Sequence, residues 1–331
     1  MSNRPSFPID HDEGGLYGDG DGDGERSSHR INLLLFALTV VSVFWTGAAQ
    51  DPSFQAFNPR HWLEIWRGWP FAVPVLAILV AHESGHYIAA RIHGVPASLP
   101  YFIPMPMLSP FGTMGAIIGM SGRIRSRIAL LDIGAAGPLA GMVVALPVLA
   151  LGLSMSTIAP ISTGHYTQEG QSLLYMLMKR VFAGRIPDGY DVQIHPTAFA
   201  GWVGLLITMI NMLPWGQLDG GHIAYALFGE RQNTFAKWIR RSLLILLGYN
   251  VLKFCVPVAL HKSALEPWVA VSNSIFWLVW FGFTGVIARV SGTADHPPFE
   301  PGALGRGRRL VAWACLVMFA LLFMPTPYAQ Y

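Results

Sequence analysis

One apolar segment, residues 69–92, constrains the fold more than any other part of the chain. It contains no charged residue from Phe71 to Val80, and it is long enough to cross a bilayer. Its second half nevertheless carries His82, Glu83 and His86. Because a carboxylate is costly to bury at that depth, the segment predicts a membrane-spanning helix with a functional polar face.

The composition places the whole chain in the same class. Of its 331 residues, 52% are hydrophobic and only 12% are charged, whereas about a quarter of a typical soluble chain is charged. The net charge of +3 comes from basic residues in loops that flank apolar segments, so no nucleic-acid partner is expected. Cys255 and Cys315 lie in apolar runs at unrelated spacing, and they predict neither a disulfide nor a cysteine metal site.

Seven apolar segments predict an all-α polytopic protein embedded in the lipid bilayer. The expected spans are 31–49, 69–92, 128–152, 196–214, 242–260, 268–288 and 310–324. With seven spans, most Lys and Arg residues fall in connections on the same side of the membrane as the N-terminus. This distribution predicts that the N-terminus is cytosolic and that the second span runs toward the cytosol. A bacterial cytoplasmic membrane fits best, and a plastid membrane is the alternative.

Polarity divides the chain into four expected regions. These are a disordered cytosolic tail at 1–30, a first span with its outer loop at 31–68, a membrane core at 69–230, and C-terminal spans at 231–331.

Residues 98–122 are apolar but cannot form a helix, because four prolines between positions 100 and 110 interrupt them. Non-helical backbone at membrane depth must be buried in protein or line a wet cavity. The segment predicts either a membrane-inserted β-hairpin or loop, whose free edge could bind an extended substrate, or a proline-rich surface loop. Residues 172–182 predict a short helix at the outer interface.

The residues from His82 to His86 follow the H-E-x-x-H pattern. On a helix, positions i and i+4 share a face, so His82 and His86 can direct imidazole nitrogens at one zinc ion. Glu83 can then act as general base toward a water in the same site. The alternative is a soluble core helix with two hydrogen-bonded histidines, which the apolar flanks disfavour.

A catalytic zinc site usually has a third protein ligand, and Asp219 is the strongest candidate. It lies at the end of the expected fourth span, where prolines and glycines break the helix at the depth of the two histidines. His222 is an alternative ligand. Asp132 is a weaker candidate, because an ion pair with Arg123, Arg125 or Arg127 explains it better. Two histidines and one carboxylate suit zinc.

These residues together carry a specific resemblance. The segments 82–86 and 218–220 resemble the paired signatures of the site-2 protease family of intramembrane zinc metalloproteases, peptidase family M50. The similarity continues through 98–104, 132–141 and 211–222, and covers roughly residues 70 to 230. It is closest to the branch with bacterial and chloroplast-type members that lack a PDZ domain.

The resemblance implies roles for named residues. It implies that His82, His86 and Asp219 bind one Zn²⁺ per chain and that Glu83 activates water. It also implies that Asn211 helps to hold the substrate and that a hairpin at 98–119, which includes Phe102 and Gly112, presents the substrate strand. Many family members carry a polar residue where Gly141 and Met142 stand here, so a substrate contact from that span is left open.

The function implied is hydrolysis of peptide bonds in or near transmembrane segments of membrane-protein substrates, as in regulated intramembrane proteolysis. Two alternatives from other classes are a metal or solute transporter and a membrane chaperone that binds helices without cutting them. A transporter usually shows repeated halves, and no second copy of either signature occurs. An intact Glu83 disfavours the chaperone, because binding alone needs no general base. The substrate and the oligomeric state are left open, as is the role of the last three spans, for which a lid, a lateral gate or packing are the alternatives.

Overall fold

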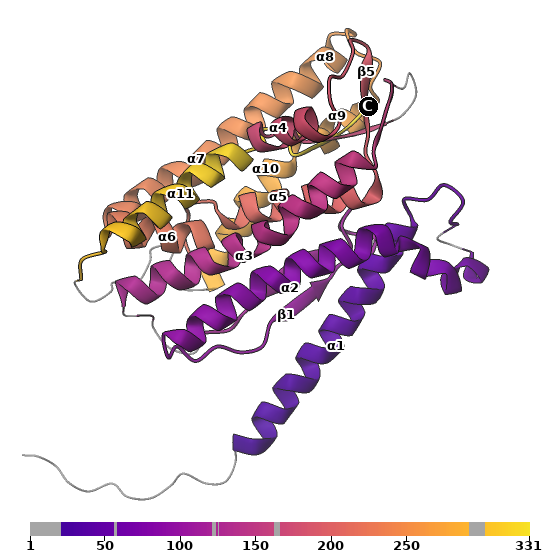
Figure 1. Cartoon of the computed structure of the whole chain (residues 1–331). Coiled ribbons are helices and arrows are strands. Elements are labelled where there is room, and N and C mark those ends of the chain that lie inside the picture. Colours follow the sequence, from indigo (N-terminus) through magenta and orange to yellow (C-terminus); the bar gives the residue numbers. More distant parts are fainter. Residues whose placement is uncertain (1–20, 56–57, 121–123, 125, 162–165, 291–301) are drawn as a thin grey trace, which may run out of the picture.

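The computed structural model describes residues 21–331 apart from 56–57, 121–123, 125, 162–165 and 291–301. Most of the described chain is helical, and the long helices lie side by side in one bundle (Figure 1). The helices are α1 (Asp21–Ala48), the 3₁₀-helix η1 (Pro59–Gly68), α2 (Trp69–Ile92), α3 (Arg127–Ser154), α4 (Leu173–Phe182), α5 (Pro196–Asn211), α6 (Asp219–Phe228), α7 (Arg231–Asn250), the π-helical turn η2 (Val251–Cys255), α8 (Val256–Ala259), α9 (Pro267–Ser274), α10 (Phe276–Val290) and α11 (Arg306–Leu322).

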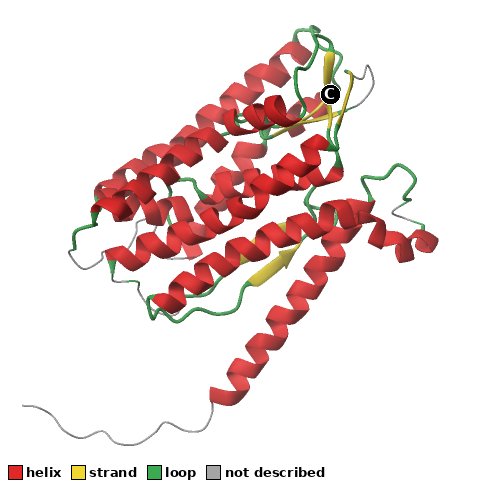
Figure 2. Ribbon diagram, in the orientation of Figure 1, coloured by secondary structure: helices red, strands yellow, loops and turns green. Residues whose placement is uncertain are grey.

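Three two-stranded antiparallel sheets accompany the helices (Figure 2), so the all-α expectation describes the spans but not the connections. Strand β1 (Tyr101–Pro104) pairs with β2 (Thr113–Ile117) directly after α2. The other pairs are β3 (Thr157–Pro160) with β5 (Tyr190–Gln193), and β4 (Thr167–Glu169) with β6 (Tyr328–Gln330).

Four described helices are long and apolar enough to cross a membrane, and a fifth span forms if one bent pair counts as a unit. The four cover His29–Ala48, Pro59–Ile92, Arg127–Ser154 and Arg231–Ala259. The bent pair joins Pro267–Ser274 to Phe276–Arg289 at an angle of 44°. Two expected spans fall below this length, because α5 stops at Asn211, shortly before Pro214, and α11 stops at Leu322, shortly before Pro325.

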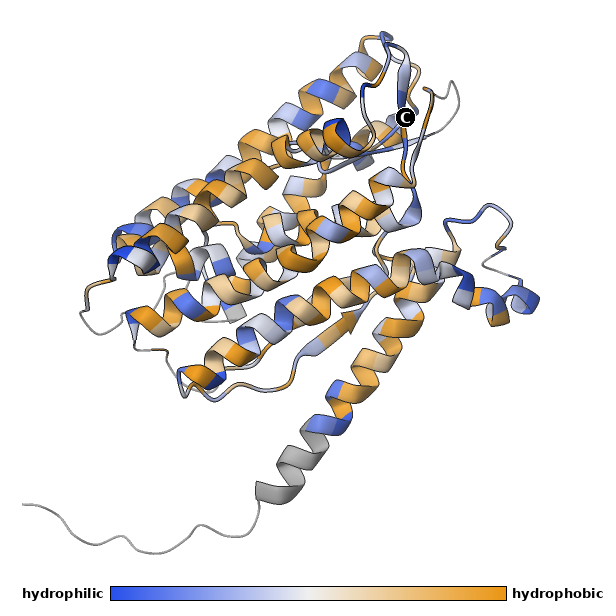
Figure 3. Ribbon diagram, in the orientation of Figure 1, coloured by the Kyte–Doolittle hydropathy of each residue, from blue (hydrophilic) through white to orange (hydrophobic). Residues whose placement is uncertain are grey.

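Many large apolar residues of these helices are exposed, and apolar residues predominate along most of the long helices (Figure 3). On α1, for example, Leu33 is 66% exposed and Leu34 is 60% exposed. Contiguous apolar surface of this extent is unfavourable in water, and it matches the hydrocarbon core of a bilayer. The chain is therefore an integral membrane protein.

Helix α1 meets α2 near its C-terminal end and then leans away from the bundle (Figure 1). It begins at Asp21, so the polar tail expected to reach residue 30 ends earlier, and residues 1–20 of that tail lie outside the described chain. Its inner face contacts the β1–β2 hairpin. The Asn32 amide donates to the carbonyls of Leu99 and Pro100, and the Ser42 hydroxyl donates to that of Gly112.

The β1–β2 pair corresponds to the proline-interrupted segment at 98–122. Its strands are short and the register shifts between Phe102 and Pro104, because proline cannot donate to the ladder. The depth of this hairpin in the membrane stays a prediction.

Helix α5 forms the centre of the bundle. Its apolar residues are buried on all sides, including Trp202, Leu205 and Met209. A helix that is apolar all round needs protein or lipid on every face, and here α2 and α3 supply much of the protein contact. This burial explains how a 16-residue helix can be held within the bundle.

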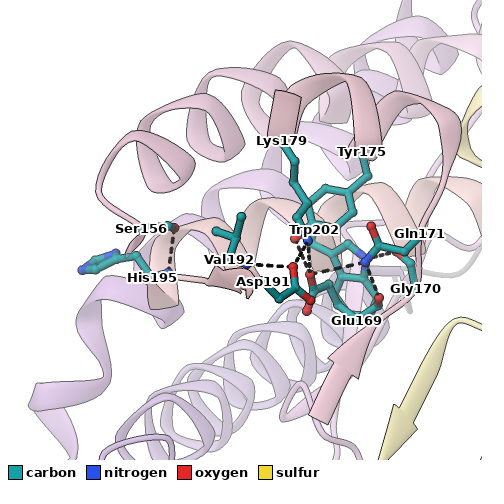
Figure 4. Close-up of polar contacts among 10 residues, drawn as sticks. All are labelled: Ser156, Glu169, Gly170, Gln171, Tyr175, Lys179, Asp191, Val192, His195 and Trp202. Carbon is teal, nitrogen blue, oxygen red and sulfur yellow. Dashed lines mark hydrogen bonds and ion pairs between the residues drawn. The ribbon is translucent and has the colours of Figure 1, made fainter. Parts of the chain in front are cut away.

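A buried polar cluster lies beyond α5, where α4 packs over β4 and β5 (Figure 4). The Lys179 ammonium is 2.9 Å from Asp191 Oδ1 and 3.4 Å from Glu169 Oε1. The Tyr175 hydroxyl donates to Glu169 Oε1 at 2.7 Å. Burial and the charge of Glu169 raise the pKa of Tyr175 well above its usual range, so the hydroxyl stays protonated as a donor. The helix that carries Lys179 and Tyr175 is α4, so the short helix predicted at 172–182 is confirmed.

This cluster gives a stability prediction. Replacing Lys179 with methionine keeps a side chain of similar volume but leaves the carboxylates of Glu169 and Asp191 without their cation. Removing one partner of a buried ion pair typically costs about 3–5 kcal/mol, so Lys179→Met should lower the thermal unfolding midpoint in detergent by several degrees. The exposed Lys262 supplies the control, and Lys262→Met should unfold like the wild type. Equal midpoints for both variants would contradict a stabilising role of the cluster.

Candidate metal centre

Two of the three candidate ligands come from one turn of α2. His82 and His86 are four residues apart, and their Nε2 atoms lie 3.2 Å apart. Both side chains are almost fully buried inside a helix long enough to span a membrane. The His86 Nδ1 atom is 2.8 Å from the Ile133 carbonyl oxygen. A carbonyl only accepts, so His86 donates from Nδ1 and its Nε2 keeps a free lone pair.

The third ligand enters from α6. Helix α5 ends at Asn211, and the chain turns so that Asp219 becomes the first residue of α6. A Cβ atom at Gly220 would overlap the carbonyl oxygen of Met212, so glycine lets the new helix start against the turn. Asp219 Oδ2 consequently lies 3.3 Å from His82 Nε2 and 3.3 Å from His86 Nε2.

These three atoms fit a zinc ion. In a tetrahedral site with bonds of about 2.0–2.1 Å, two ligand atoms are about 3.3 Å apart, which matches the three separations of 3.2, 3.3 and 3.3 Å. Among the described residues, His82, His86 and Asp219 are the group whose donors lie close enough together to hold a metal. Three protein ligands leave a fourth position open, as in catalytic rather than structural zinc sites.

Helix α3 supplies a surface without side chains beneath this triangle. A Cβ atom at Gly137 would fall on the His86 imidazole ring. Gly134, Gly137 and Gly141 follow an i, i+3, i+7 spacing, which puts them on one face of α3 toward α2 and α6. The spacing of the three glycines is a sequence signal for close helix packing, but only the structure places them against the candidate ligands.

A cavity of about 400 Å³ adjoins the triangle. Glu83 lines it together with the three candidate ligands, and its carboxylate is nearly fully buried. Asn211 also lines it, with Nδ2 at 3.5 Å from His82 Nε2. The structure thus brings together Glu83, Asn211 and the three candidate ligands from three separate segments of the chain.

Two other predicted site residues lie elsewhere. Phe102 packs against Phe36 of α1, with ring centroids 4.9 Å apart, and the Gly112 carbonyl accepts the Ser42 hydroxyl. Neither residue lines the cavity. Their contacts hold the hairpin against α1, while other hairpin residues, such as Ile103 and Ala116, face the cavity.

The structure also shows where the weaker ligand candidates lie. Asp132 lies 2.8 Å from Arg308 Nη2 and 2.9 Å from His93 Nε2, in an ion-pair cluster outside the triangle. Of its expected partners, Arg123 and Arg125 are outside the described residues, while Arg127 donates to backbone carbonyls. His222 lines the cavity but is not a member of the metal-binding group.

The geometry predicts which substitutions remove the metal. His82→Ala and Asp219→Ala each delete one corner of the triangle, so the zinc content of the purified protein should fall from about one ion per chain toward zero. Asp132→Ala is the matched control, because it removes a carboxylate that pairs with Arg308 and His93. Elemental analysis of detergent-purified protein measures the difference. Full zinc retention by Asp219→Ala would refute this ligand set.

The glycine surface gives a second prediction. Gly137→Ala should displace the His86 imidazole and lower zinc affinity at least about tenfold, the size of effect typical of disturbed ligand support. Gly248→Ala is the control, since a Cβ atom there meets nothing within 4 Å. A chelator competition titration compares the two variants, and equal affinities would show that α3 does not support His86.

Comparison with known proteins agrees with this site. The family model of peptidase family M50 matches residues 70–254. The probable zinc metalloprotease EGY1, chloroplastic, of Arabidopsis thaliana is 37% identical over 190 residues, which are 55% of this chain and 33% of that protein. The probable zinc metalloprotease EGY2, chloroplastic, of the same plant is 31% identical over 287 residues, or 85% of this chain and 45% of that protein.

A further relative, the probable zinc metalloprotease EGY1, chloroplastic, of Oryza sativa subsp. japonica, is 34% identical over 60% of this chain and 38% of its own length. The chain thus spans between a third and a half of the length of these relatives. No solved structure gives a significant match. Since the family model covers more than half of the residues, including all three candidate ligands, the chain belongs to peptidase family M50.

Proposed function

We propose that this protein is an intramembrane zinc metalloprotease that hydrolyses peptide bonds in or near transmembrane segments of membrane-protein substrates. The observation that carries the proposal is the triangle of His82, His86 and Asp219 with Glu83 in the same cavity. His82, Glu83 and His86 lie in a helix long enough to span a membrane. The family implies Zn²⁺ as the cofactor, and the separations of the donor atoms fit it.

The proposed chemistry assigns the proton transfers to Glu83. When bound, Zn²⁺ would act as a Lewis acid that polarises the scissile carbonyl and lowers the pKa of water to about 7. Glu83 takes the proton of the attacking water and later delivers it to the leaving amine. Much of the cavity wall is apolar, and this strengthens the electrostatic interactions at the reacting carbonyl. The Asn211 amide, beside His82, is positioned to donate to a substrate carbonyl.

Substrate access requires local unwinding, because the peptide groups of a transmembrane helix are shielded by their own hydrogen bonds. The β1–β2 hairpin offers a replacement for those bonds. Its sheet has two strands, and Ile103, Ala116 and Ile117 line the cavity. An unwound substrate segment that pairs with the edge of β2 recovers backbone hydrogen bonds next to Glu83.

The same proposal includes the finer topology. The four long helices and the bent pair account for five spans. If α5 and α11 also cross the membrane, the chain has seven spans, and we place its N-terminus in the cytosol. The ion-pair cluster of Asp132, His93 and Arg308 supports this arrangement, because it joins the C-terminal end of α2 to the N-terminal ends of α3 and α11. Basic residues at this end of the helices favour its location on the cytosolic side. The membrane that we propose is a bacterial cytoplasmic membrane. The proposed biological role of the protein is regulated intramembrane proteolysis.

Replacement of Glu83 separates proteolysis from binding. Glu83→Gln keeps the shape of the side chain but removes the base, so zinc content should stay near that of the wild type while cleavage of a single-span reporter falls at least about a hundredfold. The exposed Glu266 provides the control variant Glu266→Gln, which should cleave normally. A Glu83→Gln protein that cleaves at the wild-type rate would exclude this mechanism. A zinc-loaded wild type that cleaves no reporter would favour a transporter or chaperone instead.

A further inference from the structure

One wall of the metal-site cavity is formed by α10, a helix outside the region matched by the family model. Trp280, Phe283 and Ile287 of α10 line the cavity. Their i, i+3, i+7 spacing puts them on one face of the helix. All three are half-buried, and the rings of Trp280 and Phe283 meet edge-on with centroids 5.2 Å apart. The resulting wall is aromatic and aliphatic.

The hairpin contributes further apolar side chains to the same cavity. Met114 and Ile117 of β2 line it, and they are 44% and 58% exposed. The cavity volume of about 400 Å³ falls within the range of about 300–1,000 Å³ that is usual for ligand pockets. Next to the polar cluster of Glu83 and the candidate ligands there is therefore an apolar compartment with room for a side chain.

The position of α10 is fixed from outside the cavity. Arg240 of α7 donates from Nε to the Thr284 hydroxyl at 3.3 Å, and its guanidinium lies 4.2 Å from the centroid of the Phe281 ring. Thr284 itself is almost fully buried. These contacts with α7 hold α10 beside the cavity that Trp280 and Phe283 line.

We propose that Trp280, Phe283 and Ile287, facing Met114 and Ile117 of the hairpin, form a subsite that binds one apolar side chain of the substrate next to the scissile bond. This inference rests on the proposed proteolytic function and names its substrate class. The occupant is part of the unwound substrate segment, because the subsite is continuous with the cavity that contains Glu83. A charged side chain is excluded, since its burial among these groups without a partner is costly.

The subsite predicts a size preference that substitutions in α10 can change in both directions. The probe is a single-span reporter with an alanine-rich and leucine-rich membrane segment, whose cleavage site is first mapped by mass spectrometry. Versions with Ala, Leu, Phe or Asp are then made at the residues on either side of the cut, and kcat/KM is measured for each. In the wild type, the Asp versions should be cleaved slowest at the position that occupies the subsite.

Phe283→Ala enlarges the subsite and should favour larger substrate side chains. At the substrate position that occupies the subsite, the ratio of kcat/KM for the Phe reporter to kcat/KM for the Ala reporter should rise about tenfold, a typical effect of pocket size. Ile287→Trp narrows the subsite and should lower the same ratio. The control is Leu278→Ala, because Leu278 is 46% exposed and does not line the cavity. Zinc content should be equal in all four proteins.

A photocrosslinking experiment tests occupancy without turnover and covers the case in which an α10 variant fails to fold. In a Glu83→Gln background, p-benzoylphenylalanine at position 283 should crosslink to the reporter, and the same group at position 278 should not. An unchanged size preference in the α10 variants, or equal crosslinking at positions 283 and 278, would overturn the subsite proposal. The proposed proteolytic function would still stand if cleavage depended on Glu83. If the zinc-loaded wild type cleaves no reporter, both proposals fail.

Discussion

The convergence of one carboxylate and two imidazoles, with Asp219 Oδ2 3.3 Å from each Nε2 atom, is the constraint on which the rest of the site depends. Ionisable side chains are unfavourable in the hydrocarbon region unless they are paired or bind a cation. Three helices therefore have to converge on one point. Helix α2 brings His82 and His86, α6 brings Asp219, and α3 supplies the Ile133 carbonyl that orients His86.

This convergence explains the unusual local chemistry of the neighbouring segments. Helix α3 is without side chains where it faces the imidazoles, because a Cβ atom at Gly137 would occupy the position of the His86 ring. The chain between α5 and α6 is broken, because a continuous helix beyond Asn211 would carry Asp219 past the histidines instead of back toward them. The non-helical backbone between α5 and α6 lines the cavity, and a membrane tolerates such backbone only where it is buried in protein or lines a cavity.

The cavity also links the core to parts of the chain that the family model does not cover. The hairpin lies between α1 and α2, where Asn32 and Ser42 of α1 bind its carbonyls. Helix α10 closes another side and is held by Arg240. The candidate metal ligands and the hairpin thus belong to the matched region, whereas α10, which lies outside it, supplies a further wall of the cavity.

The sequence by itself determined the membrane class and the helix that carries His82 and His86, and it predicted Asp219 as the third ligand, which the structure places beside the two histidines. Each of these follows from local patterns, namely long apolar runs, an i, i+4 spacing, and a carboxylate in a broken span. It also indicated the non-helical segment after α2, because its prolines exclude a helix. The short fifth and eleventh helices and the bend before α10 were harder to predict, since length and hydropathy do not show which segments are enclosed by protein.

Only the tertiary structure decided the contacts between distant segments. It gave Asp132 the partners Arg308 and His93, it turned Phe102 and Gly112 toward α1 instead of the cavity, and it brought α10 to the metal site. The physical reason is the same in each case. Which face of a helix or strand meets which neighbour depends on the packing of all the spans together, and residues far apart in the sequence share no local pattern that records it.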